Sequence, residues 1–192
     1  MAVNDGRATE RPAGAEDVLR AAFVTGLDLA EIGSGTDEDV ALALVLPCWT
    51  LLGMLDRALR LTIDHVRTRE QFGRPLARLQ GVQFQLTDAE VERAGLAELA
   101  RYALWSIQAH RPDVVDDALA LRLAAVDAAG TVFGVCHQLH GATGFCDETT
   151  LSWLSRYSRP LRRLPLGLSE TRDQLQRRLG RRGLAGLYGG PG

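Results

Sequence analysis

Apolar residues that recur every three or four positions constrain this chain most. The pattern is clearest over residues 118–142, where the recurring positions are Ala118, Leu121, Ala125, Ala128, Val132, Val135, Leu139 and Ala142. Because an α-helix has about 3.6 residues per turn, this spacing places all of them on one helical face. No stretch alternates with a period of two for long enough to predict a strand. The sequence therefore predicts an all-α protein.

Glycine and proline divide the chain into separate helices. The first helix is expected over residues 37–70, with Thr36 and Asp39 resembling a capping box at its start and Pro47 kinking it. The second helix is expected over residues 78–110, with a turn between the two. Apolar residues at helical spacing give each of them an inward face.

Three further helices complete the expected fold. The third opens at Pro112, where proline is tolerated in a first turn, and ends at Gly141 and Gly144. A fourth carries the leucines of residues 151–164, and a short fifth follows Ser169. Long amphipathic helices joined by short turns pack as antiparallel neighbours. The prediction is an antiparallel four-helix bundle with an additional short C-terminal helix.

The bundle domain is assigned to residues 37–185. Residues 1–36 begin with a polar stretch rich in glycine, proline and arginine, so a flexible N-terminal arm is expected there. That arm includes a possible short helix over residues 16–30. Residues 186–192 are expected to form a flexible tail.

Charge and hydropathy limit the possible partners. The formal net charge of -2 gives no reason to expect nucleic acid or an anionic membrane as a partner. The uncharged run of residues 40–55 is the only candidate membrane span; it is shorter than the roughly 20 residues that a bilayer requires, and Pro47 and Gly53 interrupt it. Nine arginines over residues 156–182 make the last part of the domain basic. They suit phosphates of a nucleotide or of CoA, a solvated surface, or an acidic partner subunit.

The cysteines indicate the compartment. Cys48, Cys136 and Cys146 are scattered without a C-x-x-C spacing, and no signal peptide is recognised. A cytoplasmic protein with reduced thiols is expected. Cys136 lies near His137 and His140, which are three residues apart, but no carboxylate or second ligand pair accompanies them. No metal site is therefore expected.

Two segments carry a more specific pattern. Residues 67–76 read R-T-R-E-Q-F-G-R-P-L and are followed at 79–86 by L-Q-G-V-Q-F-Q-L, while residues 138–145 read Q-L-H-G-A-T-G-F. They resemble two signatures of the flavin-dependent acyl-CoA dehydrogenases, R-x-Q-F-G-x-P-I with a trailing Q-x-x-Q, and Q-x-H-G-G-x-G-Y. Their order and separation, about one helical hairpin, also fit. The chain is therefore similar, over residues 37–182, to the C-terminal helical domain of that family.

The resemblance implies a role in binding FAD. In the family this domain completes the FAD site across a dimer interface, with an arginine on the pyrophosphate, a glutamine and a phenylalanine around the adenosine half, and a glycine turn that approaches the cofactor closely. These roles fall on Arg69, Gln71, Phe72, Gln138, Gly141 and Gly144. Ala142 stands where the family motif has its second glycine. Without any cofactor, Arg69 would also complement the dipole of a helix that ends there.

The resemblance also bears on catalysis. In many family members a glutamate immediately before a G-T-S-E-like turn is the catalytic base, and the best counterpart here, P-L-G-L-S-E, places Leu166 at that position. Other members carry the base early in the first long helix, where this chain has Ala43 and Leu44. Glu148 and Glu170 are the nearby carboxylates. Because leucine and alanine cannot accept a proton, no catalytic base is expected on this chain.

Two functions remain open. Some bacterial acyl-CoA dehydrogenases combine two unlike chains, one of which has lost the base, and this sequence is similar to the degenerate chain over residues 140–145 and in its arginine-rich end. That resemblance implies a truncated subunit that completes the FAD site of a longer partner, which desaturates an acyl-CoA or other acyl thioester. The alternative is a flavin-free binding or scaffolding module, as a homo-oligomer. A repurposed enzyme without redox chemistry ranks last, because no acid–base pair is visible.

Overall fold

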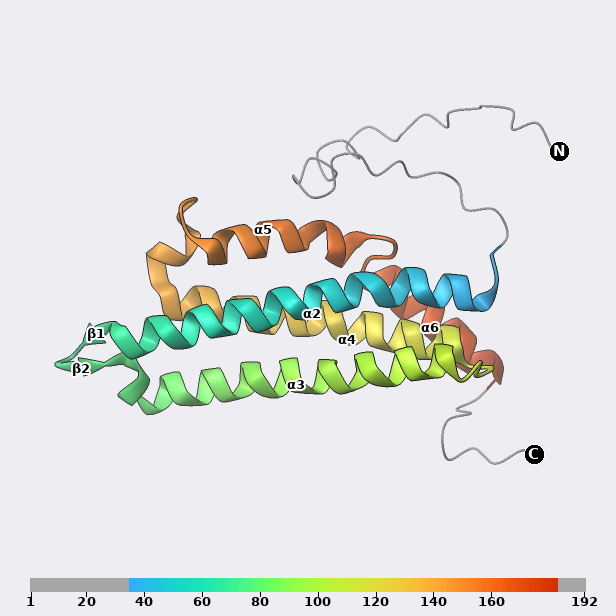
Figure 1. The fold of residues 1–192 in the computed structure, drawn as a ribbon, viewed down its shortest axis with the longest axis horizontal. Coiled ribbons are helices and arrows are strands. Elements are labelled where there is room, and N and C mark those ends of the chain that lie inside the picture. The colour runs from blue at the N-terminus through green and yellow to red at the C-terminus, as the bar shows by residue number, and fades with distance from the viewer. Residues whose placement is uncertain (1–34, 183–192) are drawn as a thin grey trace, which may run out of the picture. The chain divides into compact units, whose positions relative to one another are not determined.

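A computed structural model of the chain describes residues 35–182, all within the compact unit Ile32–Gly192. Nearly all of the predicted arm, with its possible short helix, and the predicted tail lie outside these residues. The described part contains five α-helices: α2 (Asp37–Thr68), α3 (Gln80–Gln108), α4 (Val114–His140), α5 (Thr150–Arg163) and α6 (Leu168–Arg182). Successive helices run back and forth along one another, with the short α6 at the end (Figure 1). The predicted all-α bundle with an additional C-terminal helix is confirmed.

Helix α2 begins where the sequence predicted. The Thr36 Oγ1 accepts a hydrogen bond from the Asp39 N–H at 3.2 Å, and the Asp39 carboxylate accepts one from the Thr36 N–H at 2.8 Å. This is the reciprocal capping box. The Thr36 N–H and the Thr36 hydroxyl, at 2.9 Å, both donate to the Asp39 carboxylate and hold its pKa below its ordinary value. The helix continues through Pro47 and ends at Thr68, two residues before the predicted end.

The chain forms a small β-hairpin directly after α2. Strands β1 (Glu70–Gln71) and β2 (Arg74–Pro75) pair antiparallel, and the short 3₁₀ helix η1 (Leu76–Arg78) leads into α3. Phe72 and Gly73 both have positive φ, 55° and 74°, which is the backbone of the tight turn that joins two-residue hairpins. The prediction of no strand is wrong here, because two residues per strand are too few to show an alternation.

Helix α4 is the central helix of the core. It packs against α2, α3, α5 and α6, and its small side chains let the neighbouring helices approach closely. Most of the predicted stripe is buried: Ala118, Leu121, Ala125, Ala128, Val132 and Leu139. Val135 is half-buried, and Ala142 is exposed because it lies after the end of α4 in the turn η2 (Gly141–Phe145). Helix α4 itself starts at Val114, two residues beyond the predicted Pro112.

Two helices, rather than one, are long and apolar enough to cross a bilayer. The test of length and composition is met by Asp37–Thr68, which contains the predicted run, and also by Val114–Phe145. Core helices of soluble proteins meet the same test. Both segments contribute heavily to the shared core, and α2 supplies Val45, Leu51 and Leu55 to it as fully buried side chains.

A buried arginine links α5 to the core, a contact that no sequence pattern predicted. Arg122 of α4 is fully buried. Its Nε and Nη2 donate to the Leu166 carbonyl at 3.1 and 2.9 Å, and its Nη1 donates to the Leu161 carbonyl. A guanidinium can serve several carbonyls at once, and its charge complements the C-terminal end of α5. Burial lowers the pKa of Arg122.

The arginine-rich end of the domain is partly paired within the chain. The Arg178 Nε donates to the Asp116 carboxylate, which links α6 to α4. The Arg156 Nη1 lies 2.9 Å from the Asp147 carboxylate, and the Arg162 guanidinium lies 5.8 Å from the centre of the Phe133 ring. Part of this basic segment therefore stabilises the fold itself.

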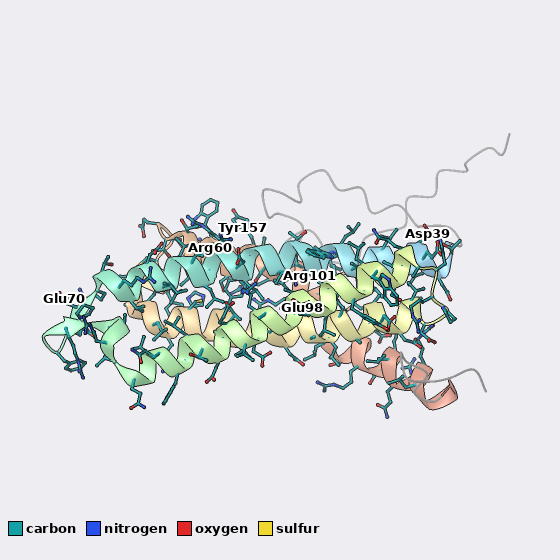
Figure 2. All side chains as sticks on the ribbon, turned by 60° about the horizontal axis from the view of Figure 1, so that its bottom comes forward. Asp39, Arg60, Glu70, Glu98, Arg101 and Tyr157 are labelled. Carbon is teal, nitrogen blue, oxygen red and sulfur yellow. The ribbon has the colours of Figure 1, made fainter. Side chains whose placement is uncertain are left out.

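Replacement of the buried guanidinium tests its structural role. Arg122→Met is expected to lower the free energy of unfolding by about 2–4 kcal/mol, because the carbonyls of Leu161 and Leu166 lose their donors inside the protein. Chemical denaturation measures the change. The matched control is Arg101→Met, since Arg101 pairs with Glu98 on the exposed side of α3 (Figure 2) and should change stability by less than about 0.5 kcal/mol. Equal effects of the two substitutions would contradict the assignment.

Candidate functional site

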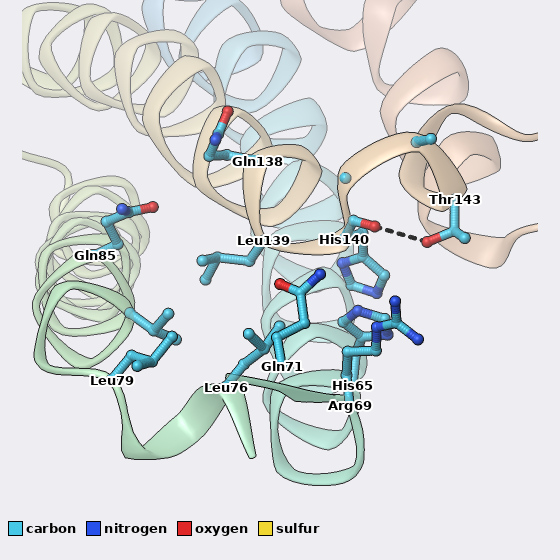
Figure 3. A pocket seen from close by; sticks show the side chains of 13 residues that line it. His65, Arg69, Gln71, Leu76, Leu79, Gln85, Gln138, Leu139, His140 and Thr143 are labelled. Carbon is cyan, nitrogen blue, oxygen red and sulfur yellow. Dashed lines mark hydrogen bonds between the residues drawn. The ribbon is translucent and has the colours of Figure 1, made fainter. Parts of the chain in front are cut away.

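The two sequence motifs meet at one end of the bundle. The end of α2, the hairpin, the start of α3 and the turn after α4 surround an open pocket of about 560 Å³ (Figure 3). Of the six residues predicted to bind a cofactor, Arg69, Gln71, Gln138 and Gly141 line this pocket. Phe72 and Gly144 do not. Residues more than 60 positions apart in the sequence thus line one pocket.

Arg69 is held by its backbone at the junction between α2 and the hairpin. It is the C-cap of α2, with an extended backbone. Its N–H donates to the His65 carbonyl at 2.8 Å, and its carbonyl accepts from the Leu76 N–H at 2.9 Å. Both backbone groups are therefore fixed while the guanidinium lines the pocket. The same position also suits the alternative role of a cation at a helix C-terminus.

The turn after α4 requires glycine at its first position. Gly141 has a φ of 61°, and its N–H donates back to the carbonyls of His137 and Gln138. The Thr143 hydroxyl donates to the His140 carbonyl at 2.7 Å, which closes the turn (Figure 3). The wall of the pocket is therefore a compact, hydrogen-bonded turn.

Gly144 is needed for packing against α4. It is buried, and a Cβ added there would lie 2.9 Å from the Cβ of His140 and 3.3 Å from the Nδ1 of His137. Only glycine lets η2 fold back onto α4 in this way. Next to it, the Phe145 ring stacks on the His137 ring with 4.5 Å between their centres. Gly144 therefore positions the turn, and it does not itself line the pocket.

Phe72 occupies the tip of the hairpin, which projects past the end of the helices (Figure 1). Its side chain is 85% exposed, and its backbone has positive φ, an unfavourable conformation for a bulky residue. Nothing within the described part of the chain covers this ring. An exposed aromatic ring on a strained turn is costly unless another surface covers it.

A stacked pair of histidines was missed in the sequence. The rings of His65 and His140 lie 4.3 Å apart at an angle of 19°, and both line the pocket beside Arg69 (Figure 3). The Nδ1 of His140 lies 2.9 Å from the Cys136 carbonyl. Burial, then His140, then Arg69 lower the pKa of His65. The position of His65, one helical turn before Arg69, is the feature of the sequence that could have indicated the pair.

The positions that the sequence resemblance assigned to a catalytic base are apolar in this structure. Leu166 is half-buried, and its carbonyl accepts from Arg122. On α2, Ala43 is half-buried and Leu44 is buried. Glu170, one of the two nearby carboxylates, is exposed in the first turn of α6, where it accepts a hydrogen bond from Gln174 at 2.9 Å. Glu148 is also exposed, in the segment before α5.

Cys136, His137 and His140 of α4 were the residues considered for a metal site. Over the described residues, no three His, Cys, Asp or Glu side chains lie close enough together to hold a metal ion. Burial raises the pKa of the Cys136 thiol to about 11, so this group stays protonated at neutral pH. Burial also lowers the pKa of His137.

The chemistry of the pocket fits the phosphate and adenosine part of a dinucleotide. Its lining includes three basic side chains and, among the described residues, no carboxylate. A guanidinium binds phosphate oxygens in a forked geometry. Leu76, Leu79, Val82 and Leu139 provide an apolar wall on which a base can lie, and three glutamines provide amide donors and acceptors.

Comparison with known proteins identifies the class. The model of the acyl-CoA dehydrogenase C-terminal domain matches residues 45–180. Because this match covers more than half of the chain, the chain belongs to the acyl-CoA dehydrogenase family through that domain. The resemblance read from the two motifs is confirmed.

Individual relatives agree with this assignment. The chain is 34% identical over 110 residues to 3-sulfinopropanoyl-CoA desulfinase of Paraburkholderia xenovorans, covering 56% of this chain and 27% of that protein. It is 35% identical over 92 residues to the acyl-CoA dehydrogenase FadE28 of Mycobacterium tuberculosis, covering 48% and 27%. A chain of the ChsE4–ChsE5 complex from the same organism superposes with a TM-score of 0.69 at 26% identity, covering 83% of this chain and 44% of that one. The chain thus spans about a quarter of these curated relatives.

Substitution of two glycines, Gly144 in η2 and Gly130 inside α4, distinguishes an effect on packing from an effect on helix propensity. Gly144→Ala is expected to lower the free energy of unfolding by about 1–3 kcal/mol, because the added Cβ overlaps the Cβ of His140. Gly130→Ala, at an exposed position inside α4 with open space around it, should raise stability by up to about 1 kcal/mol. Thermal denaturation compares the two. A stabilising Gly144→Ala would show that η2 does not pack as described.

Proposed function

We propose that this chain is a subunit of an acyl-CoA dehydrogenase-type complex, in which its pocket holds the adenosine and pyrophosphate part of an FAD that a longer partner chain carries. The observation that supports this most is the convergence of the two family motifs on one pocket with three basic side chains and no carboxylate among the described residues. A structural role alone would not require an arginine and two histidines from separate segments of the chain to gather around one pocket.

The residues of this chain have distinct tasks in the proposed site. Arg69 binds the pyrophosphate, and its backbone position is fixed by hydrogen bonds with His65 and Leu76. Gln71 and Gln138 offer amide groups to the adenosine, and the turn at Gly141 keeps the wall close to the cofactor. When bound, the flavin supplies the acceptor for the hydride that leaves the acyl thioester.

The catalytic base is proposed to belong to the partner. Leu166, Ala43 and Leu44 occupy the positions at which the family places a base, and none of these side chains exchanges a proton. The substrate is proposed to be an acyl-CoA or another acyl thioester bound mainly by the partner. This chain then contributes to cofactor binding and to orientation rather than to proton transfer.

Assembly with an unlike chain has two supports. One of the structural neighbours is described as a complex of two differently named proteins, ChsE4 and ChsE5. In addition, the exposed Phe72 at the hairpin tip is the kind of aromatic side chain that anchors protein interfaces. We propose that this hairpin inserts into the partner next to the adenosine.

Loss of the guanidinium tests the cofactor role. The chain is co-expressed with a longer acyl-CoA dehydrogenase-like chain, and the visible absorbance of the purified complex is recorded. Arg69→Leu is expected to weaken retention of the flavin by about tenfold or more, because a charge-assisted contact with the pyrophosphate is lost. Arg67→Leu is the matched control, since Arg67 is exposed on the same helix and does not line the pocket.

Two results would contradict this proposal. An Arg69→Leu complex that keeps the full yellow colour would remove Arg69 from the cofactor site. A wild-type chain that purifies colourless and as a homo-oligomer, with no affinity for the longer chain, would instead support the flavin-free binding module.

The hairpin tip provides a second, independent test. Phe72→Asn is expected to leave the isolated chain as stable or slightly more stable, because asparagine tolerates positive φ better than phenylalanine. The same change should weaken association with the partner by about tenfold or more, as for an aromatic anchor. Thermal denaturation and a titration of the two chains measure the effects. Loss of stability together with unchanged association would contradict the interface role.

A further inference from the structure

We infer that His65, His140 and Arg69 form one anion-binding group that takes up a proton when a phosphate-bearing ligand binds. The inference rests on the proposed function for the nature of the ligand, which is the diesterified pyrophosphate of an adenine dinucleotide. It adds two residues and a pH dependence to the site. The proton comes from solvent, and no covalent bond is made or broken.

The rings of His65 and His140 lie together at the wall of the pocket. The two rings stack with 4.3 Å between their centres, and both line the pocket together with Arg69. The Nδ1 of His140 lies 2.9 Å from the Cys136 carbonyl, which can only accept a hydrogen bond, so Nδ1 donates to it and the ring is oriented. The Thr143 hydroxyl fixes the carbonyl of His140 at the same time. The His140 ring is therefore held in position before a ligand arrives.

Protonation of both stacked imidazoles is unfavourable because the two positive charges repel each other. At 4.3 Å, and beside a guanidinium that is always charged, the second proton is opposed by its neighbours. Accordingly, burial and repulsion from His140 and Arg69 lower the pKa of His65. The lowered pKa therefore favours the neutral form of His65 in the free protein at neutral pH.

No negatively charged group among the described lining residues offsets the repulsion within the pair. Among the described residues, the charged or titratable groups that interact with the pair are Arg69 at the end of α2 and His137 on α4. The Cys136 thiol, one helical turn before His140, stays protonated because burial raises its pKa to about 11. Helix α3 contributes Gln85 and η2 contributes Thr143, neither of which is charged. No carboxylate of the described residues lines the pocket. An anionic ligand is then the partner that offsets the repulsion and draws a proton onto the pair.

Nuclear magnetic resonance of the histidine side chains tests this directly. The chain has four histidines, so each imidazole can be assigned by single substitution. The probe is ADP-ribose, whose pyrophosphate is diesterified and does not titrate near neutral pH. With the probe bound, the titration midpoint of His65 is expected to rise by about one pH unit or more, as for an opposite charge within a few ångströms. The signals of His65 and His140 should both shift.

Internal controls are available in the same sample. His110 lies 2.5 Å from the Glu38 carboxylate, on side chains that do not line the pocket, so its signals should not respond to the probe. Adenosine, which lacks the pyrophosphate, should leave the His65 midpoint unchanged. A His65 midpoint that is the same with and without ADP-ribose, or a chain that does not bind ADP-ribose, would overturn the inference.

Affinity at different pH values gives a second readout. Between about pH 7.5 and about pH 5.5, ADP-ribose should bind about tenfold more tightly, because the bound form holds one more proton than the free form. His65→Phe keeps a flat ring in the stack but cannot take a proton, and it should lose this pH dependence. His110→Phe should keep it. Equal pH dependence in the two variants would overturn the role of the pair.

This experiment fails independently of the proposed function, because ADP-ribose contains no flavin and the assay needs no partner chain. Proton uptake in a chain that forms no yellow complex would keep the anion site and remove the flavin role. A yellow complex whose chain shows no proton uptake would keep the flavin role and remove the inference made here.

Discussion

Close packing of α4 against its neighbours is the constraint on which the rest of the structure depends. Small side chains along α4 let α2 and α3 approach it closely, and this fixes how the three helices align. As a result, the end of α2 and the end of α4 meet at the same end of the bundle. Neither motif makes a pocket by itself. Arg69 gains its neighbours His140 and Gln138 only because the helices between them are packed in this register.

Much of this arrangement followed from sequence patterns. Helical spacing predicted the helices and most of the α4 core. Two short motifs predicted six residues at one cofactor site, of which Arg69, Gln71, Gln138 and Gly141 line the pocket and Phe72 and Gly144 do not. Other features were hidden because they depend on contacts between distant residues. Arg122 reads as an ordinary polar residue until α5 brings the carbonyls of Leu161 and Leu166 beside it. The hairpin at Phe72 was missed because a two-residue strand has no measurable period.

The motif residues are of two kinds: those that the fold itself requires and those that it does not. Glycine is needed at position 144 because a side chain there would overlap α4. It is needed at Gly141 because the backbone has positive φ. Phe72 has no such explanation within the described part of the fold, and its ring is exposed on a strained turn. Residues whose cost the fold does not explain are the best guide to function. Here they lie at the hairpin and pocket, where a nucleotide and a partner chain are proposed to meet.

The most direct measurement is an experimental structure of this chain bound to the longer dehydrogenase-like chain and FAD. The account predicts that the FAD pyrophosphate lies within hydrogen-bonding distance of the Arg69 guanidinium, with the adenosine against the wall of Leu76 and Leu139. A complex in which the pyrophosphate contacts only the partner, with the pocket of this chain facing solvent, would contradict it.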